Sequence, residues 1–242
     1  MTSPRSNQPL ADDDDPFLSL RSGATEILLI RHADALPDSQ HVIAGGYDEQ
    51  PLSALGNRQA QALARRLENE KLAALYASPA PRARATAAYV SQAVGLPVQI
   101  EPGVREVYFG ETGIQSGEDN ATASLSDVLR AQLRLAAVTA MTTGSWASID
   151  GAEPSAVLRA RVNDTVSSLA NAHSGQRIAI ISHAGTINAY LAAVLGLERD
   201  YFFPAANTSI SIVRVRGSRH LLLCLNDVGH LRSEGLLALP PE

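Results

Sequence analysis

Residues 27–34, which read Ile-Leu-Leu-Ile-Arg-His-Ala-Asp, decide the fold of this chain. The four aliphatic residues, bounded by polar ones, are typical of a buried strand in a parallel sheet that is covered on both faces. Ligands of open α/β sheets bind beyond the carboxyl ends of the strands, where Arg31 and His32 stand. An arginine offers a fixed fork of donors to an oxyanion, and a neutral histidine can act as a nucleophile. The pair therefore indicates phosphoryl chemistry, although many strands end in a solvated Arg or His.

A second stretch, residues 178–188, repeats this layout as Ile-Ala-Ile-Ile-Ser-His-Ala-Gly-Thr-Ile-Asn. An apolar strand pattern leads to His183, and a turn of small residues then opens a helix. The first backbone N–H groups of such a helix favour a bound anion. A single histidine at a strand end is more often a hydrogen-bonded structural residue than a catalyst. Two histidines at the ends of two strand patterns favour a functional site.

The rest of the sequence alternates helix and strand patterns, which predicts an α/β fold. Helices are expected over residues 53–68 with Ser53 as N-cap, 81–94, 125–140, 153–172 and 186–195, and strands over 72–77, 98–100, 209–215 and 220–225. We expect a three-layer sandwich, with a mostly parallel central sheet and helices on both faces. The polar stretch 113–123 and the helix that follows it predict a helical insertion at the carboxyl edge of the sheet.

The domain organisation follows from the composition. Residues 1–25 include a run of four Asp and have little to bury, so we expect a disordered acidic tail. Residues 26–242 form one α/β domain, within which residues 107–150 make the helical insertion or lid. With 242 residues, 45% of them hydrophobic, the chain has ample material for a core.

Charge and cysteine content exclude several classes of function. The net charge is −5 with acidic and basic residues interspersed, so no basic surface indicates nucleic acid. No signal peptide and no apolar run of about 18 residues is present, so no membrane association is expected. The single cysteine, Cys224, is expected to fill the core, and one thiol without Cys/His spacing argues against a metal site. A cytoplasmic location is compatible with this content.

Five segments together resemble the histidine phosphatase superfamily, which includes phosphoglycerate mutases and fructose-2,6-bisphosphatases. Arg-His-Ala at residues 31–33 resembles the signature Arg-His-Gly, and Ser-His-Ala-Gly at 182–185 resembles Ser-His-Gly-Gly. Residues 52–60 resemble the segment Leu-Ser/Thr-x-x-Gly-x-x-Gln-Ala, and residues 78–87 resemble Ser-Ser-Pro-Leu-x-Arg-Ala-x-x-Thr-Ala. Residues 104–110 resemble Leu-x-Glu-x-x-x-Gly. The segments follow the family's order and spacing from about residue 26 to about residue 215.

The resemblance implies a role for each matching residue. His32 is the nucleophile that becomes a phosphohistidine, and its other ring nitrogen must donate to a backbone acceptor to fix the tautomer. Arg31, Arg82 and His183 bind the phosphate, and His183 also belongs to the catalytic set. Glu106 donates a proton to the leaving group and then activates water. No metal and no cofactor is expected, because the basic side chains neutralise the phosphate.

Some residues admit a purely structural interpretation. Glu106 could instead form a salt bridge with Arg105 or another surface base. Arg84 is expected to be a solvated helix residue. The histidines without a matching context are expected on the surface or in loops: His41, His173, His220 and His230.

Two departures concern glycines of the family pattern. Ala33 and Ala184 replace the glycines that follow the two histidines. Alanine disfavours positive φ, so both turns must keep ordinary backbone angles.

Other departures bear on the reaction. The mutase branch has a Ser and an Asn soon after Arg-His-Gly, whereas residues 34–39 lack that pattern. Residues 150–154 replace its Gly-Gly-Glu-Ser segment, and a carboxylate at Asp34 or Asp38 would disfavour a second phosphate. Hydrolysis of a small phosphorylated substrate is therefore expected, by a phosphomonoester hydrolase.

Two alternatives stay open beside hydrolysis: a phosphoglycerate mutase-type phosphotransferase and a non-catalytic phosphate-binding regulatory module. The sequence does not identify the substrate, whose selecting residues are expected between residues 108 and 150. The hydrophobic content of the helical insertion is compatible with a homodimer.

Overall fold

The computed structural model describes residues 15–35, 50–108, 125–149 and 151–237. In chain order its elements are η2 (Leu20–Ser22), β1 (Thr25–Arg31), α1 (Ala54–Leu67), β2 (Ala74–Ala77), α2 (Pro81–Val94), β3 (Val98–Ile100), η4 (Pro102–Val104), α3 (Leu125–Thr143), η5 (Trp146–Ser148), α4 (Ser155–Ala172), β4 (Arg177–Ser182), α5 (Ala184–Val194), β5 (Ile210–Arg216), β6 (Arg219–Asp227) and α6 (Gly229–Arg232). The elements labelled η are single turns of 3-10 helix. Each helix and strand expected from the sequence is present, with its ends shifted by a few residues at most.

The described chain forms a mixed six-stranded sheet with the order β3-β2-β4-β1-β5-β6. The pairs β3–β2, β2–β4 and β4–β1 are parallel, whereas β5 runs antiparallel to both of its neighbours. Strand β1 lies inside the sheet, which explains its uninterrupted aliphatic run. Because Arg31 pairs with Ser182, β1 and β4 end at the same level, and the histidines that follow them become neighbours.

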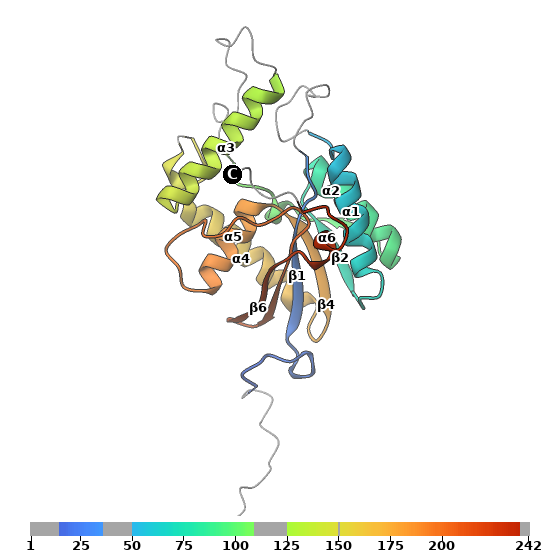
Figure 1. Cartoon of the computed structure of the whole chain (residues 1–242). Helices are drawn as coiled ribbons and strands as arrows, with labels where there is room; N and C mark the ends of the chain where they lie inside the picture. The colour runs from blue at the N-terminus through green and yellow to red at the C-terminus, as the bar shows by residue number, and fades with distance from the viewer. Residues whose placement is uncertain (1–14, 36–49, 109–124, 150, 238–242) are drawn as a thin grey trace, which may run out of the picture.

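Helices cover both faces of the sheet, as expected (Figure 1). On one face, Leu63 and Leu67 of α1 and Ala83 and Ala87 of α2 pack against the sheet. On the other face, side chains of α4 and α5 pack against the alternate residues of the same strands. The three-layer α/β sandwich predicted from the sequence is therefore confirmed.

The expected tail boundary at residue 25 is wrong for the part that the structure describes. Leu18 and Ala24 are buried, and Asp15 accepts hydrogen bonds from the backbone N–H groups of Phe17 and Ser19, at 2.9 and 2.7 Å. The acidic composition concealed these contacts, because a single buried leucine is enough to anchor a short turn. Residues 1–14 of the expected tail lie outside the described residues.

Helix α3 lies beyond the carboxyl ends of the strands (Figure 1). Its last turns and the segment after it join the core through Ala140 and Trp146, which are 0% and 5% exposed. Residues 109–124 and 150, the remainder of the expected insertion, lie outside the described residues. No helix in the described ranges is long and apolar enough to cross a membrane.

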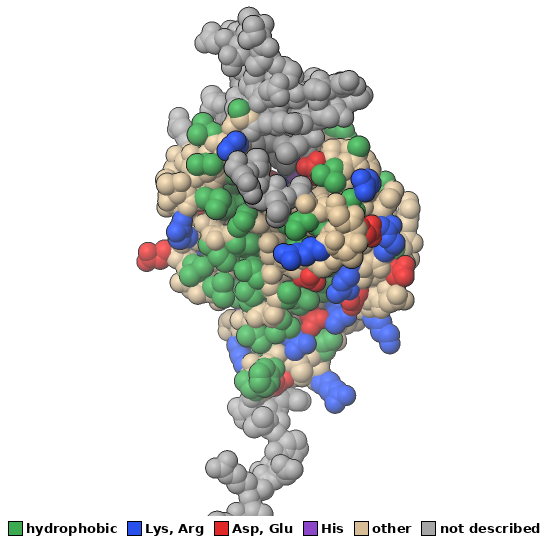
Figure 2. Space-filling view, in the orientation of Figure 1, with side chains coloured by type: hydrophobic (Ala, Val, Ile, Leu, Met, Phe, Trp, Pro, Cys, Tyr) green, Lys and Arg blue, Asp and Glu red, His purple; other side chains and the backbone are tan. Residues whose placement is uncertain are grey.

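Two smaller expectations are wrong. Cys224 is partly exposed because it lies on β6, an edge strand of the sheet. Leu223 and Leu225 of the same strand are exposed. Hydrophobic side chains gather on the face of the molecule that Figure 2 shows. His230 is buried rather than on the surface, and its Nε2 bonds the Thr208 hydroxyl at 3.1 Å. A lone histidine in a polar segment carries no sequence signal for such burial.

Gly56 provides a test of how α1 packs against the segment that follows His32. A Cβ at Gly56 would lie 1.9 Å from the backbone carbonyl oxygen of Asp34. Gly56→Ala must therefore displace backbone, and we expect a loss of about 1–3 kcal/mol in the free energy of unfolding, measured by urea titration. Arg58→Ala, on the exposed side of the same helix, should change it by about 0.5 kcal/mol or less. Equal stabilities for the two variants would contradict the close approach.

Candidate active site

His32 follows β1 directly and is 1% exposed. Its Nδ1 lies 2.7 Å from the Ala33 carbonyl oxygen, which is the backbone acceptor that the proposed chemistry requires. Arg82 Nε donates to His32 Nε2 at 3.2 Å. This pattern assigns the proton to Nδ1 and leaves the lone pair on Nε2. A neutral imidazole in this tautomer can act as a nucleophile through Nε2.

His183 is the N-cap residue of α5 and lies beside His32, with the two ring centroids 5.0 Å apart. Arg82 Nη2 bonds His183 Nδ1 at 3.3 Å, so that nitrogen accepts and the proton lies on Nε2. Nε2 in turn donates to the Ser78 hydroxyl at 2.7 Å. The fully buried Arg82, in the first turn of α2, therefore joins both histidines through one guanidinium.

Arg31 lies at the end of β1, where a loop from residue 205 to residue 209 supports it. Its Nη1 donates to the Ala205 carbonyl at 2.7 Å, and its buried Nε makes no hydrogen bond within the described part of the chain. The Asn207 side chain donates to the His32 carbonyl at 3.0 Å, and the Thr208 N–H donates to the Arg31 carbonyl at 3.0 Å. Thr208 has φ of 54°, which is strained for a β-branched residue. The loop therefore holds the backbone of both Arg31 and His32 at the cost of local strain.

Both histidines are held neutral by their surroundings. Burial lowers the pKa of His32 well below its usual value, and the positive charges of Arg82 and Arg31 lower it further. The same causes lower the pKa of His183, with burial again the largest. Two imidazoles beside two guanidinium groups thus form a cationic site without being protonated themselves. Such a site suits a phosphate dianion.

Glu106 lies against the amino end of α5, where Gly185 has no side chain to occupy the space of the carboxylate. Its carboxylate accepts from the N–H groups of Val107 and Thr186, at 3.0 and 3.2 Å. A Cβ on Gly185 would lie 2.7 Å from Glu106 Oε1, so a side chain there would displace the carboxylate. Ala184, by contrast, keeps ordinary backbone angles, as its substitution for glycine requires.

Burial raises the pKa of Glu106, and this effect outweighs the opposing effects of the Val107 N–H and of Arg82 and Arg31. A carboxyl with a raised pKa stays protonated to a higher pH and can donate that proton. The alternative salt bridge with Arg105 is not formed. Arg105 instead bonds Glu153, at 3.2 Å, and Arg161 bonds the same carboxylate at 2.7 Å.

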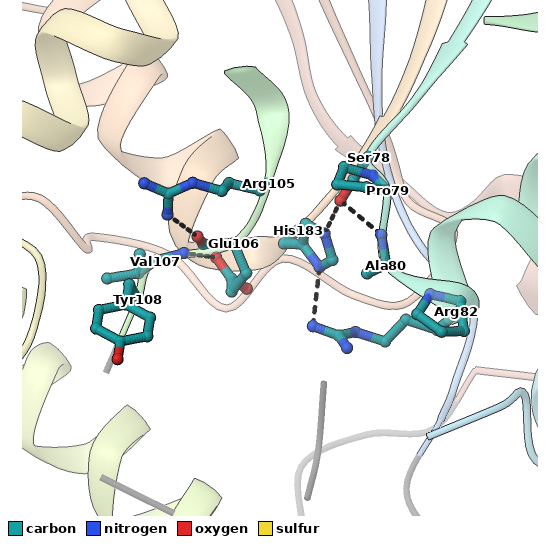
Figure 3. Close-up of a pocket in the computed structure, with 10 residues that line it drawn as sticks. Ser78, Pro79, Ala80, Arg82, Arg105, Glu106, Val107, Tyr108 and His183 are labelled. Atoms are coloured by element: carbon teal, nitrogen blue, oxygen red, sulfur yellow. Dashed lines mark hydrogen bonds between the residues drawn. The ribbon is translucent and has the colours of Figure 1, made fainter. Parts of the chain in front are cut away.

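A cavity of about 250 Å³ opens beside these groups (Figure 3). Its lining includes Ser78, Arg82, Arg105, Glu106, Tyr108 and His183. In Figure 3, Glu106 lies on one side of the cavity, and His183 and Arg82 on the other. The cavity thus has a guanidinium and an imidazole opposite the Glu106 carboxyl. Among the described residues, no group of three or more His, Cys, Asp or Glu side chains is arranged to hold a metal ion.

Comparison with known proteins decides the family. The sequence profile of the histidine phosphatase superfamily (branch 1) matches residues 27–228. The chain belongs to the histidine phosphatase superfamily. The resemblance and the enzyme class predicted from the sequence, a phosphatase of this superfamily, are confirmed.

Individual relatives agree with this assignment. A metal-independent phosphoserine phosphatase from Arabidopsis thaliana is 27% identical over 225 residues, which cover 91% of this chain and 89% of the relative. Phosphoglycerate mutase-like protein 4 of the same organism is also 27% identical, over 218 residues, covering 88% of this chain and 89% of the relative. The structure of YhfR from Bacillus stearothermophilus shares the fold, with a TM-score of 0.67 and 24% identity over 86% of this chain and all of that one.

The structure brings together the five residues that the sequence singled out: Arg31, His32, Arg82, Glu106 and His183. Sequence reasoning assigned no role to Ser78, Asn207 or Thr86, whose hydroxyl accepts from the Ala33 N–H at 3.0 Å. Ser78 could have been found, because it follows a strand that ends at the same edge as β1 and β4. Asn207 and Thr86 carry no such signal. Arg84 is exposed, as expected.

Ser78→Ala tests whether the superfamily site depends on the orientation of His183. The substitution removes the acceptor of the buried His183 Nε2 proton and frees the ring to change tautomer. We expect kcat/KM for an aryl phosphate to fall by about tenfold, and the free energy of unfolding to fall by about 1–3 kcal/mol because a buried donor loses its acceptor. Ser91→Ala, towards the carboxyl end of α2, is the matched control and should keep full activity. Full activity in Ser78→Ala would show that this hydrogen bond does not matter.

Proposed function

We propose that the protein hydrolyses phosphomonoesters without a metal ion, through a phosphohistidine on His32. The observation that carries this proposal is the hydrogen bonding of His32: Nδ1 donates to the Ala33 carbonyl, and Nε2 faces the buried Arg82 with its lone pair. A nucleophile is thus aimed at a group that binds phosphate. Arg31, Arg82 and His183 are the proposed phosphate-binding residues.

In the first step, His32 Nε2 attacks phosphorus as the bond to the ester oxygen breaks. The phosphoryl group moves to His32, and Glu106 gives its proton to the departing alkoxide. Phosphoryl transfer has a loose transition state, so positioning and charge neutralisation do most of the work. Arg31 and Arg82 supply the neutralising positive charge. When phosphate binds, Arg82 would donate to it in place of its hydrogen bond to His32.

In the second step, water attacks the phosphohistidine. The Glu106 carboxylate accepts a proton from this water, the N–P bond breaks, and inorganic phosphate leaves with His32 neutral again. Glu106 returns to its protonated form, so the cycle closes without another reactant. In both steps His183 keeps its Nε2 proton on the Ser78 hydroxyl, so it can bind phosphate only after Nδ1 takes up a proton, which an adjacent phosphate dianion favours.

The proposed substrate is a small phosphorylated metabolite, and phosphoserine is the first to test. A relative named metal-independent phosphoserine phosphatase from Arabidopsis thaliana supports this choice, and so does phosphoserine phosphatase 1 from Hydrogenobacter thermophilus, 27% identical over 217 residues. A mutase activity, which the mutase-like relative supports, would require a bisphosphorylated primer. The Asp34 carboxylate accepts from the Ser53 hydroxyl at 2.5 Å, and its negative charge disfavours a second phosphate there. Asp38 lies outside the described residues.

The broader assignments remain proposals of the same kind. Residues 107–150 would act as a substrate-selecting lid over the carboxyl edge, and residues 1–14 as an acidic tail. We propose a cytoplasmic location, with no partner in nucleic acid or membrane, and a homodimer that size measurements in solution would reveal.

His32→Ala tests the nucleophile. We expect the natural chain to hydrolyse an aryl phosphate equally with and without EDTA, and His32→Ala to lose the activity by at least about 10³-fold, because the proposed phosphoryl acceptor is removed. His173→Ala, at the carboxyl end of α4, is the control and should remain active. Turnover that survives in His32→Ala would rule out the phosphohistidine.

Glu106→Gln tests the proton donor through the leaving group. An alkyl phosphate leaves as a strong base and needs the proton, so kcat should fall by about 10²–10⁴-fold. A nitrophenyl phosphate leaves as a weak base, so its phosphorylation step should be slowed much less. Single-turnover measurements on both substrates separate this step from the hydrolysis of the phosphoenzyme. An equal loss for the two leaving groups in this first step would exclude Glu106 as the acid.

A further inference from the structure

Two aromatic residues from separate segments meet near Glu106. Trp146 belongs to the short turn η5 after α3, and Tyr201 lies in the loop between α5 and β5. Their rings stand edge to face, with centroids 5.2 Å apart, and the residues are only 5% and 7% exposed. Both belong to the core cluster that also contains Val107, the neighbour of Glu106.

Gly185 shows how close this pair comes to the carboxyl. The position that a Cβ would occupy on Gly185 lies 2.7 Å from Glu106 Oε1 and 3.1 Å from Trp146 Cζ2. The indole ring and the carboxyl therefore pack on the same glycine. The charges of Glu106 and Arg31 also act on the Tyr201 hydroxyl, whose pKa is raised chiefly by burial.

Asp200 clamps the two aromatic segments to each other. Asp200 precedes Tyr201 and is 1% exposed, and its carboxylate accepts from Arg159 Nε at 2.7 Å and from the Ser145 hydroxyl at 3.1 Å. Ser145 immediately precedes Trp146. The Asp200 backbone N–H adds a hydrogen bond to the Gly144 carbonyl at 2.6 Å. These hydrogen bonds fix the residue before each aromatic ring, so the two segments cannot separate without breaking partly buried hydrogen bonds.

We propose that Trp146 and Tyr201 are positioning residues that exclude water from the Glu106 carboxyl and so extend to higher pH the range in which it can donate a proton. The inference rests on the proposed function, in which Glu106 is the general acid. Removing a ring would admit water and favour the ionised carboxylate. The Glu106 carboxyl would then lose its proton at a lower pH than in the natural chain.

Other groups that face Glu106 do not supply this effect. Arg82 on α2 and Arg31 on β1 carry positive charge, and the amides of Val107 and of Gly185 on α5 donate hydrogen bonds; each of these favours the ionised form. The neutral His183 and the Glu153-paired Arg105 complete the polar lining of the cavity. In the part of the chain that the structure describes, apolar covering opposes these groups, and Trp146 and Tyr201 contribute to it together with Val107.

The experiment compares Tyr201→Ala with Tyr201→Phe, which keeps the ring and removes only the hydroxyl. We expect the basic limb of the kcat/KM profile for an alkyl phosphate to move down by about one pH unit in Tyr201→Ala and to stay in place in Tyr201→Phe. A folded Tyr201→Ala with an unmoved limb would overturn the proposal, as would an equal shift in both variants.

A direct titration of Glu106 distinguishes this inference from the proposed function. Carbon-13 NMR of the labelled carboxyl, assigned by its loss in Glu106→Gln, needs no turnover. A lower titration midpoint in Tyr201→Ala than in the natural chain supports the exclusion of water by Trp146 and Tyr201, even if no substrate is hydrolysed. If Tyr201→Ala does not fold, Ser145→Ala, which loosens the clamp, replaces it, and an unchanged midpoint in that variant overturns the proposal.

Discussion

The buried guanidinium of Arg82 is the constraint on which the site depends. A fully buried cation is costly unless hydrogen bonds compensate it, and here two of its donors go to His32 Nε2 and His183 Nδ1. Both contacts require imidazole nitrogens with free lone pairs, so the guanidinium selects the neutral form and the tautomer of each ring. The arrangement that compensates the buried guanidinium also leaves a lone pair on His32 Nε2 next to the group that would bind phosphate.

The sheet supplies the positions that this constraint needs. Parallel neighbours β1 and β4 end at one level, and β2 ends beside them, so His32, His183 and Ser78 come from three adjacent strand ends. The antiparallel β5 then brings its preceding loop back to β1, where Asn207 and the strained Thr208 hold the backbone of His32 and Arg31. Strain at that turn is tolerated because the turn is tied to two strands at once.

The sequence predicted the parts of the structure that depend on periodicity and strand ends. The aliphatic run before Arg31 and the helix from Pro81 to Val94 were placed within about a residue, because burial on both faces and a terminal glycine leave few alternatives. Contacts between distant segments could not be predicted in this way. Trp146 and Tyr201 carry no local pattern, and Leu18 and His230 are buried only because other segments cover them.

Burial has opposite effects on the two kinds of titratable group, and the site uses both. It lowers the pKa of the imidazoles, since their charged form is the protonated one, and it raises the pKa of Glu106, since the charged form of a carboxyl is the deprotonated one. A nucleophile without a proton and an acid with one are what phosphoryl transfer to a histidine requires. One low-dielectric cavity can therefore prepare both partners at the same pH. The positive charges of the arginines add to the effect of burial on the histidine pKa values, but they oppose the effect of burial on the pKa of Glu106. The carboxyl alone therefore needs the additional apolar covering of Trp146 and Tyr201.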